Sequence, residues 1–203
     1  LNVEAVRFAY GLRAVTSRTP VTPEERQAYI QRLLKESLIT EAYLTWVNGL
    51  SAEDRNQMGL LHNGSFELPL GKEVFDWQWS PHRQVVARTA AILGVAGERA
   101  LQLIFRNQEG RFQHLHQALY LEPSTYRLSG KVLLDSLTSQ GGLRWTLRCL
   151  RPRQVVLGES ERFLGSGKWR GFKMDFEVPE GCQLQEVRLE SAGRQGLEQR
   201  VGG

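Results

Sequence analysis

The sequence contains no long apolar run. A membrane-spanning helix requires about 20 consecutive, mostly apolar residues, and no such stretch occurs among the 203 residues of the chain. The first residues also lack the basic and then apolar layout of a signal peptide. We therefore expect no membrane span in this chain, and a targeting segment would have to lie upstream of it.

A block of like charge is also missing. The 26 Lys and Arg residues exceed the 22 Asp and Glu residues by only four, and the basic residues, mostly Arg, are scattered among the acidic ones. Proteins that bind nucleic acid gather their basic residues on one segment or face. The charge pattern therefore indicates no nucleic-acid partner. A composition of 41% hydrophobic and 24% charged residues is that of a globular protein.

Cysteine is scarce, with only Cys149 and Cys182 in the chain. A disulfide between them would close a loop of about 33 residues, contribute roughly 3 to 4 kcal/mol and indicate an oxidising compartment. Two buried free thiols fit the sequence equally well. His114 and His116 have no thiolate partner nearby, so their spacing does not indicate a zinc site.

Motifs of catalysis are missing too. Carboxylates are plentiful, but they show no distinctive spacing for the pair that a glycosidase needs. Ser160 and Ser166 do not stand in a nucleophile elbow. The sequence Gly165, Ser166, Gly167 is interpreted as a turn, because it lacks the Lys-Ser or Lys-Thr pair of a phosphate-binding loop. We expect no enzymatic activity.

Residues 1–58 are expected to form a helical segment. Apolar residues recur at three- and four-residue spacing over 23–36 and 38–49, and Thr22 is a suitable N-cap for the first of these helices. An earlier helix is predicted over 2–15. The helical hairpin resembles one tetratricopeptide-type unit, and such units normally stack on neighbours to bury their apolar faces.

The hydrophobic period then changes to two. Apolar and polar residues alternate over 101–106, 126–134, 143–149 and 172–178, and Gly, Pro and Asn residues separate these runs. About eight short strands without intervening helices predict two antiparallel sheets packed face to face. We therefore expect a mainly β protein in which residues 59–203 form an antiparallel β-sandwich of the jelly-roll kind.

Several short motifs of this β region resemble those of a known family. In chain order they are NGSFE (63–67), FDW (75–77), PSTYRLS (123–129) and WRGFKMDFEVPEGC (169–182). Together they resemble the galactose-binding-like jelly rolls of carbohydrate-binding modules. They are also similar to a jelly-roll domain that follows tetratricopeptide repeats in bacterial proteins, some of which are tied to exopolysaccharide production. The resemblance covers about residues 60–192 and implies polysaccharide binding in the periplasm or outside the cell.

The resemblance also implies a metal ion. In many such modules the first of these motifs and an acidic closing strand together hold a structural calcium ion, which needs several oxygen ligands. Asn63 and Glu67 match the first half of that site. The second half has no counterpart, because the sequence continues after Glu190 as SAGRQGLEQRVGG. The sequence therefore contains only half of a calcium site.

Sugar binding in water uses flat aromatic faces together with polar groups that replace the hydrogen bonds of the sugar hydroxyls to water. In RFQHLHQALYL (111–121), a period of two places Phe112, His114, His116 and Tyr120 on one face of a strand. A solvated face would show the same pattern. The candidate ligand contacts are Trp79, His114, His116 and Tyr120, followed by Trp77 and Trp169.

The sequence thus predicts a non-catalytic module that binds polysaccharide and that a helical segment joins to a tetratricopeptide array. An alternative is that the same sheet, or the helices, dock a partner protein in a cell-envelope or polymer-assembly complex, because a shared fold does not fix a shared ligand. Trp77 and Trp79 also have a structural interpretation, in which they fill the rim between sheet and helices. Trp46 and Trp145 are expected in the core.

Overall fold

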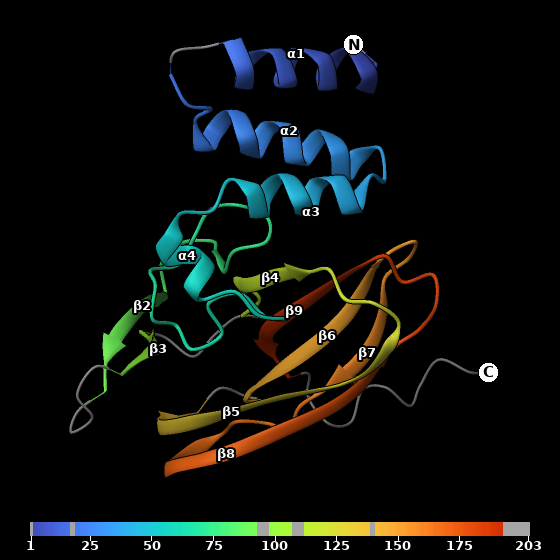
Figure 1. Ribbon diagram of the computed structural model, residues 1–203. Helices are drawn as coiled ribbons and strands as arrows, with labels where there is room; N and C mark the ends of the chain where they lie inside the picture. The colour runs from blue at the N-terminus through green and yellow to red at the C-terminus, as the bar shows by residue number, and fades with distance from the viewer. Residues whose placement is uncertain (1, 17–18, 93–97, 107–111, 139–140, 193–203) are drawn as a thin grey trace.

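Strands dominate the structure. The computed structural model describes residues 2–16, 19–92, 98–106, 112–138 and 141–192, with 42% strand and 24% helix. The named strands of this part of the chain pair antiparallel throughout. The expectation of a mainly β, antiparallel protein is confirmed, whereas the jelly roll stays a prediction. Figure 1 shows the helices stacked on one side of the strands.

The N-terminal part of the chain folds into helices, as predicted. They are α1 (Val3–Thr16), α2 (Pro23–Lys35), α3 (Ile39–Asn48) and the short α4 (Ala52–Asn56). Thr22 caps α2: its hydroxyl accepts from the Glu25 amide at 3.2 Å, and the Glu25 carboxylate accepts from the Thr22 amide at 2.8 Å. The apolar period did not predict α4, because five residues are too few to show one.

A central sheet has five strands in the order β1-β4-β9-β6-β7. The last strand of the described chain, β9, lies between β4 and β6 and therefore joins the two halves of the sheet. The strand bounds are β1 (Gln78–Trp79), β4 (Leu115–Leu119), β6 (Leu143–Arg151), β7 (Val155–Glu159) and β9 (Leu184–Ser191).

Two separate strand pairs complete the β region. One is the hairpin of β2 (Val85–Ala91) and β3 (Arg99–Phe105), and the other is the long ribbon of β5 (Ser124–Leu137) and β8 (Gly165–Val178). The interpretation of Gly165 to Gly167 as a turn was wrong, because these residues begin β8. The pairing of β5 with β8 shifts register there, and Gly165 has a φ of +82°, which glycine adopts without steric cost.

The larger of two buried cores lies between the β5–β8 ribbon and the central sheet. Met174, Phe176 and Val178 alternate along β8 and belong to one buried cluster with Trp145 and Leu147 of β6. The position expected for Trp145 is therefore confirmed. Cys149 and Cys182 form a disulfide, which ties β6 to the turn before β9. The structure thus decides between the two alternatives that the sequence left open.

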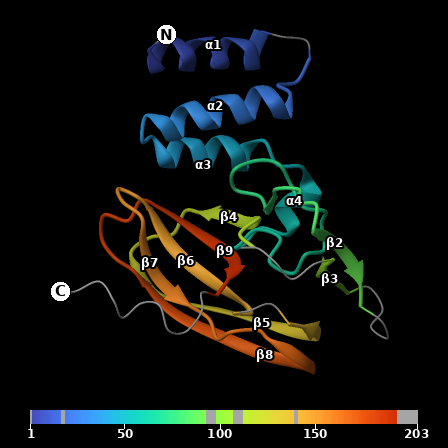
Figure 2. The same ribbon diagram turned by 180° about the vertical axis from the view of Figure 1, so that it is seen from behind.

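The second core joins the helices to the sheet. Both views of the molecule show α3 between α2 and the sheet (Figures 1 and 2). Trp46 of α3 is fully buried in this core, as expected. The sheet contributes Ala118 of β4 and Leu184 of β9, and the helices contribute mainly Tyr29, Ile30, Leu33, Ile39 and Ala42.

The segment between α4 and β1 fills the space where the two cores meet. Phe75 belongs to the helical core and Trp77 to the larger one. The Trp77 Nε1 donates to the Asn63 carbonyl at 3.1 Å. The buried Gln117 side chain of β4 donates to the carbonyls of His62 and Phe75 at 3.1 and 2.8 Å. This segment, with its unusual density of aromatic residues, therefore serves the junction of helices and sheet.

Candidate functional site

The side chains of β4 alternate as predicted only from Leu115 onward. Leu115 and Leu119 point into the larger core, whereas Ala118 and Tyr120 pack against the helices. The prediction that Phe112 shares a face with both histidines holds for His114, whose ring lies 5.7 Å from that of Phe112, and was wrong for His116. Phe112 lies in the larger core together with Leu115, because the backbone before β4 is not a regular strand and the period breaks there.

Two of the candidate ligand contacts take part in packing. The Tyr120 ring lies 5.1 Å from the ring of Tyr43 in α3, and its hydroxyl is 2.9 Å from the Thr40 hydroxyl. Trp77 is only 2% exposed, and its ring lies 5.5 Å from that of Trp145. Trp77 thus leaves almost no surface for a ligand to stack on, and Tyr120 belongs to the contact between α3 and the sheet.

Trp79 and His114 do meet, at the edge of the sheet. Their rings are 6.2 Å apart, and the His114 ring stacks on that of His82 at 4.6 Å. Burial lowers the pKa of His114, and the nearby His82 and Arg188 lower it further. The His114 imidazole is therefore uncharged at neutral pH. His82 was not among the predicted contacts.

His116 lies on the other face of the sheet. Trp79 pairs with Leu115 and Gln78 with His116, so that strand alternation separates the Trp79 and His116 side chains. The His116 Nε2 is 3.1 Å from the Gln78 side-chain oxygen. Burial lowers the pKa of His116. The structure therefore brings together Trp79 and His114 but joins neither His116 nor Tyr120 to them.

Ion pairs cover the sheet face on which His116 lies. Glu186 and Arg188 pair along β9 at 2.8 Å. Arg148 of β6 pairs with Glu190 of β9 at 2.6 Å, and the same carboxylate accepts from the buried Thr146 hydroxyl at 2.8 Å. These charges are neutralised within the face itself, which leaves it a poor candidate for binding a charged ligand.

Asn63 and Glu67 do not fit a calcium site. The Asn63 side-chain amide accepts from the Leu68 N–H and donates to the Leu68 carbonyl, both at 3.0 Å. These two hydrogen bonds close the loop between Asn63 and Leu68. Glu67 accepts from the Arg99 amide at 3.2 Å. Calcium takes about six to eight oxygen ligands. In the part of the chain that the structure describes, no group of three His, Cys, Asp or Glu side chains is placed to hold a metal ion.

Trp169 is the most exposed of the candidates, since 44% of it is exposed, whereas Trp77 is buried and the others are only partly exposed. Because Met174 and Phe176 point into the core, strand alternation turns Trp169, Gly171 and Lys173 to the outer face of β8. Gly171 leaves a gap between the other two side chains. A Cβ at that position would have no atom nearer than the Gly130 carbonyl oxygen at 3.9 Å.

Strand β5 completes this outer face. Lys131 lies directly opposite Gly171, and Ser129 lies directly opposite Lys173. Leu133, which is half exposed, follows Lys131 on the same side of the strand. We refer to this surface as the Trp169 face, defined by Ser129, Lys131, Leu133, Trp169, Gly171 and Lys173.

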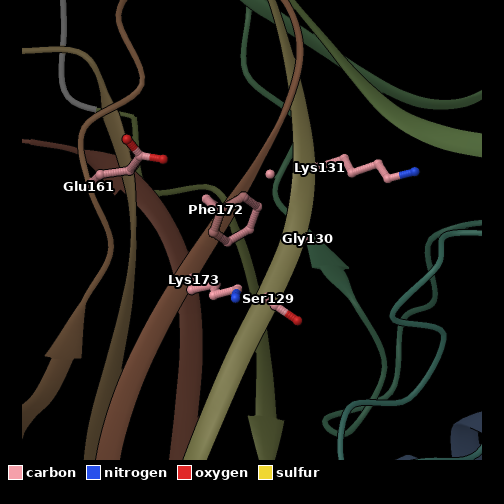
Figure 3. Close-up of a pocket in the computed structure, with 7 residues that line it drawn as sticks. Ser129, Gly130, Lys131, Glu161, Phe172 and Lys173 are labelled. Atoms are coloured by element: carbon pink, nitrogen blue, oxygen red, sulfur yellow. The ribbon is translucent and has the colours of Figure 1, made fainter.

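A shallow depression of about 540 Å³ adjoins the Trp169 face where both strands carry glycine. Figure 3 shows Lys131 extending away from Phe172 and Glu161, while Ser129 and Lys173 lie side by side. The Phe172 ring packs so closely over Gly130 that a Cβ there would meet it at 2.8 Å. The lining residues are Ser129, Gly130, Lys131, Glu161, Gly171, Phe172 and Lys173.

The sequence contained a signal for Lys131, Lys173 and Gly171 that our prediction did not use. In the alternation of each strand, these residues stand at the positions between the core residues. The alternation therefore places them on the solvent side of two predicted strands. Alternation does not predict that β5 pairs with β8. Only this pairing brings the two lysines and Trp169 onto one surface.

Comparison with models of known protein families gives no match, and comparison with curated proteins gives no significant one. Among the described residues, no helix has both the length and the apolar character needed to cross a membrane.

Proposed function

We propose that the protein is a non-catalytic polysaccharide-binding module of the jelly-roll kind and that the Trp169 face is its binding surface. The observation that carries the proposal is the position of Trp169. This large ring is 44% exposed on the outer face of a two-stranded ribbon, next to backbone that Gly171 leaves uncovered. A sugar ring stacked on Trp169 would extend over Gly171 without meeting a side chain.

The chemistry of the face supports a sugar ligand. An indole ring offers an apolar surface of the size of a pyranose together with one N–H donor. Ser129 and the two lysines supply the polar groups that would replace water around the sugar hydroxyls. The face is open rather than deep, which suits a polymer that lies across a surface.

The disulfide supports a location outside the cytoplasm. Disulfides form and persist in the periplasm and outside the cell, and they are rare in reducing compartments. With the Cys149–Cys182 disulfide in its core, the protein fits a periplasmic or extracellular role in the production or export of a bacterial exopolysaccharide.

The proposal is tested by affinity electrophoresis in gels that contain one polysaccharide each. We expect a polysaccharide to retard the wild-type protein and Trp169→Ala to abolish the retardation. Phe8→Ala is the matched control. It removes an aromatic ring that is even more exposed than Trp169 and that belongs to α1, outside the β region. Equal retardation of wild type and Trp169→Ala by every polymer would exclude the Trp169 face as the binding surface.

Docking of a partner protein is the second candidate function, and α1 favours it. No residue of α1 is buried. Phe8, Leu12 and Val15, spaced four and three residues apart on one helical face, are 72%, 48% and 83% exposed. Such an apolar stripe suits an apolar helix of a cell-envelope protein or of a helical repeat.

The docking function is tested with a variant of that stripe. Phe8→Ser combined with Val15→Ser should abolish binding of a purified envelope partner. Leu164→Ser, at an exposed leucine of the β region, is the matched control and should leave binding intact. If the stripe variant binds the partner as tightly as wild type does, α1 is not the docking surface.

A further inference from the structure

The Trp169 face contains two lysines, Lys131 and Lys173. Among the described residues, neither Lys131 nor Lys173 forms an ion pair, whereas the two arginines of the ribbon do: Arg127 pairs with Asp175, and Arg170 pairs with Glu161 of the segment before β8. Both oxygens of Asp175 accept from Arg127, at 2.6 and 3.0 Å. The Arg127 hydrogen bonds, and to a lesser extent the Lys173 charge, lower the pKa of Asp175. Asp175 is therefore already bonded to Arg127, and neither lysine donates a hydrogen bond to a carboxylate among the described residues.

The register of the ribbon places the two lysines around one point. Lys131 is the direct neighbour of Gly171, and Lys173 is two positions further along β8. Such diagonal neighbours lie about 7 to 8 Å apart across an antiparallel pair. The gap at Gly171 lies between Lys173 and Trp169 on one strand and beside Lys131 on the other. A group carried by a ring stacked on Trp169 would thus reach both ammonium groups.

The hydrogen-bonding capacity of the face selects the ligand. An ammonium group donates hydrogen bonds and cannot accept them. A neutral sugar presents hydroxyls that need acceptors as well as donors, and Ser129 is the only member of the face whose side chain accepts. A carboxylate, by contrast, is purely an acceptor and forms charge-assisted hydrogen bonds with ammonium groups. The face therefore matches a ring that carries its own carboxylate.

We infer that the ligand of the Trp169 face is an acidic polysaccharide whose sugars bear carboxylates, with Trp169 stacking on a ring while Lys131 and Lys173 bind its carboxylate. The inference depends on the proposed function and adds its substrate class and two specificity-determining residues. Single-stranded nucleic acid is the less suitable ligand, because a channel for it needs cations along many phosphates, and the two arginines of the ribbon are already paired.

The test uses polygalacturonate and the same polymer after chemical reduction of its carboxylates. Binding is measured by isothermal titration. We expect the wild-type protein to bind polygalacturonate at least tenfold more tightly than the reduced polymer. The double variant Lys131→Gln and Lys173→Gln should bind both polymers alike. The double variant Lys35→Gln and Lys72→Gln changes the net charge equally at two exposed lysines outside the ribbon and should keep the full preference.

The outcomes separate the inference from the proposed function. If wild type binds both polymers equally and Trp169→Ala binds neither, the acidic class is wrong and polysaccharide binding stands. If wild type binds neither polymer, the inference is overturned, and the proposed function is decided by the panel of polysaccharides used in affinity electrophoresis. If single-stranded DNA binds more tightly than polygalacturonate, and the Lys131 and Lys173 variant loses that binding, the face is a nucleic-acid site and both are overturned.

Discussion

Arg26 and Glu73 show what a single buried ion pair does in this fold. Arg26 of α2 donates to the Glu73 carboxylate at 2.7 Å and to the Gly49 carbonyl at 2.9 Å. The two side chains are only 16% and 10% exposed. Burial raises the pKa of Glu73, and the Arg26 guanidinium opposes that rise. One pair thus links α2, the end of α3 and the segment that leads to the sheet.

Removing one partner of that pair is predicted to be costly. Glu73→Gln should lower the free energy of unfolding by about 3 kcal/mol, because it leaves the Arg26 charge buried without a counterion. Asp175→Asn breaks an exposed pair with Arg127 and is the control, with an expected loss below about 1 kcal/mol. Urea denaturation of both variants measures the difference. Equal losses would show that Arg26 finds a substitute partner.

The histidines predict how stability depends on pH. Burial lowers the pKa values of His62, His114 and His116 below their ordinary value of about 6.5. The unfolded chain then binds protons more readily than the folded one. The histidine contribution is fully present above about pH 6.5 and is lost as the pH falls toward the lowered values. Glu73 and Asp76, whose pKa values burial raises, act in the opposite direction at lower pH.

We therefore expect the free energy of unfolding to decrease from pH 7.5 to pH 5.5. Urea titrations at a series of pH values provide the measurement. The double variant His62→Gln and His116→Gln should show a shallower dependence over this interval, because two of the three lowered groups are absent. A wild-type stability that stays constant or increases toward pH 5.5 would contradict the burial of these imidazoles.

At the scale of helices and strands, local sequence pattern was a good guide. Helix α2 begins at Pro23 behind its Thr22 cap, and the alternations over 143–149 and 172–178 correspond to β6 and β8. The failures have local causes. The period breaks between Phe112 and Leu115, where the chain enters β4, and glycines near Gly165 belong to a bulged strand rather than a turn. Periodicity detects regular strands and misses such irregularities.

Two glycines of the ribbon are predicted to respond in opposite ways to substitution. Gly171→Val should abolish polysaccharide binding by filling the gap beside Trp169, while stability stays constant or increases by about 0.5 kcal/mol, because glycine is a poor strand residue. Gly130→Ala should destabilise the protein, because its Cβ would meet the Phe172 ring at 2.8 Å. Denaturation and affinity electrophoresis of both variants test the contrast.

A smaller substitution at Gly171 tests whether binding depends on how much of the gap is filled. Gly171→Ser adds a small side chain that leaves most of the gap open, so weakened but detectable binding is expected. If Gly171→Val binds polysaccharide as wild type does, the ligand does not cross the ribbon at this point. The Trp169 face would then need a different boundary.

At the scale of the whole molecule, the sequence could not show which surface the helices cover. Tyr120 was predicted to face a ligand, because alternation alone separates the two sides of β4. In the structure that side meets α3, and Tyr120 contacts Tyr43 and Thr40, some eighty residues earlier in the chain. Whether a helix covers one face of a strand depends on contacts between residues far apart in the sequence. The hydrophobic period of the strand does not encode such contacts. Trp169 had the same parity signal and lies on the side that stays open.

The Cys149–Cys182 disulfide closes a loop that contains both β7 and β8, and it therefore acts on the assembly of the layers as a whole. Cross-linking across 33 residues restricts the unfolded chain and should contribute about 3 to 4 kcal/mol. Replacing both cysteines by Ala should lower the free energy of unfolding by about that amount and leave the folded structure unchanged. Reducing agent should destabilise wild type equally and have no effect on the double variant, which serves as its control. If reduction leaves wild type as stable as before, the bond makes no contribution, and the argument from it for an oxidising compartment fails as well.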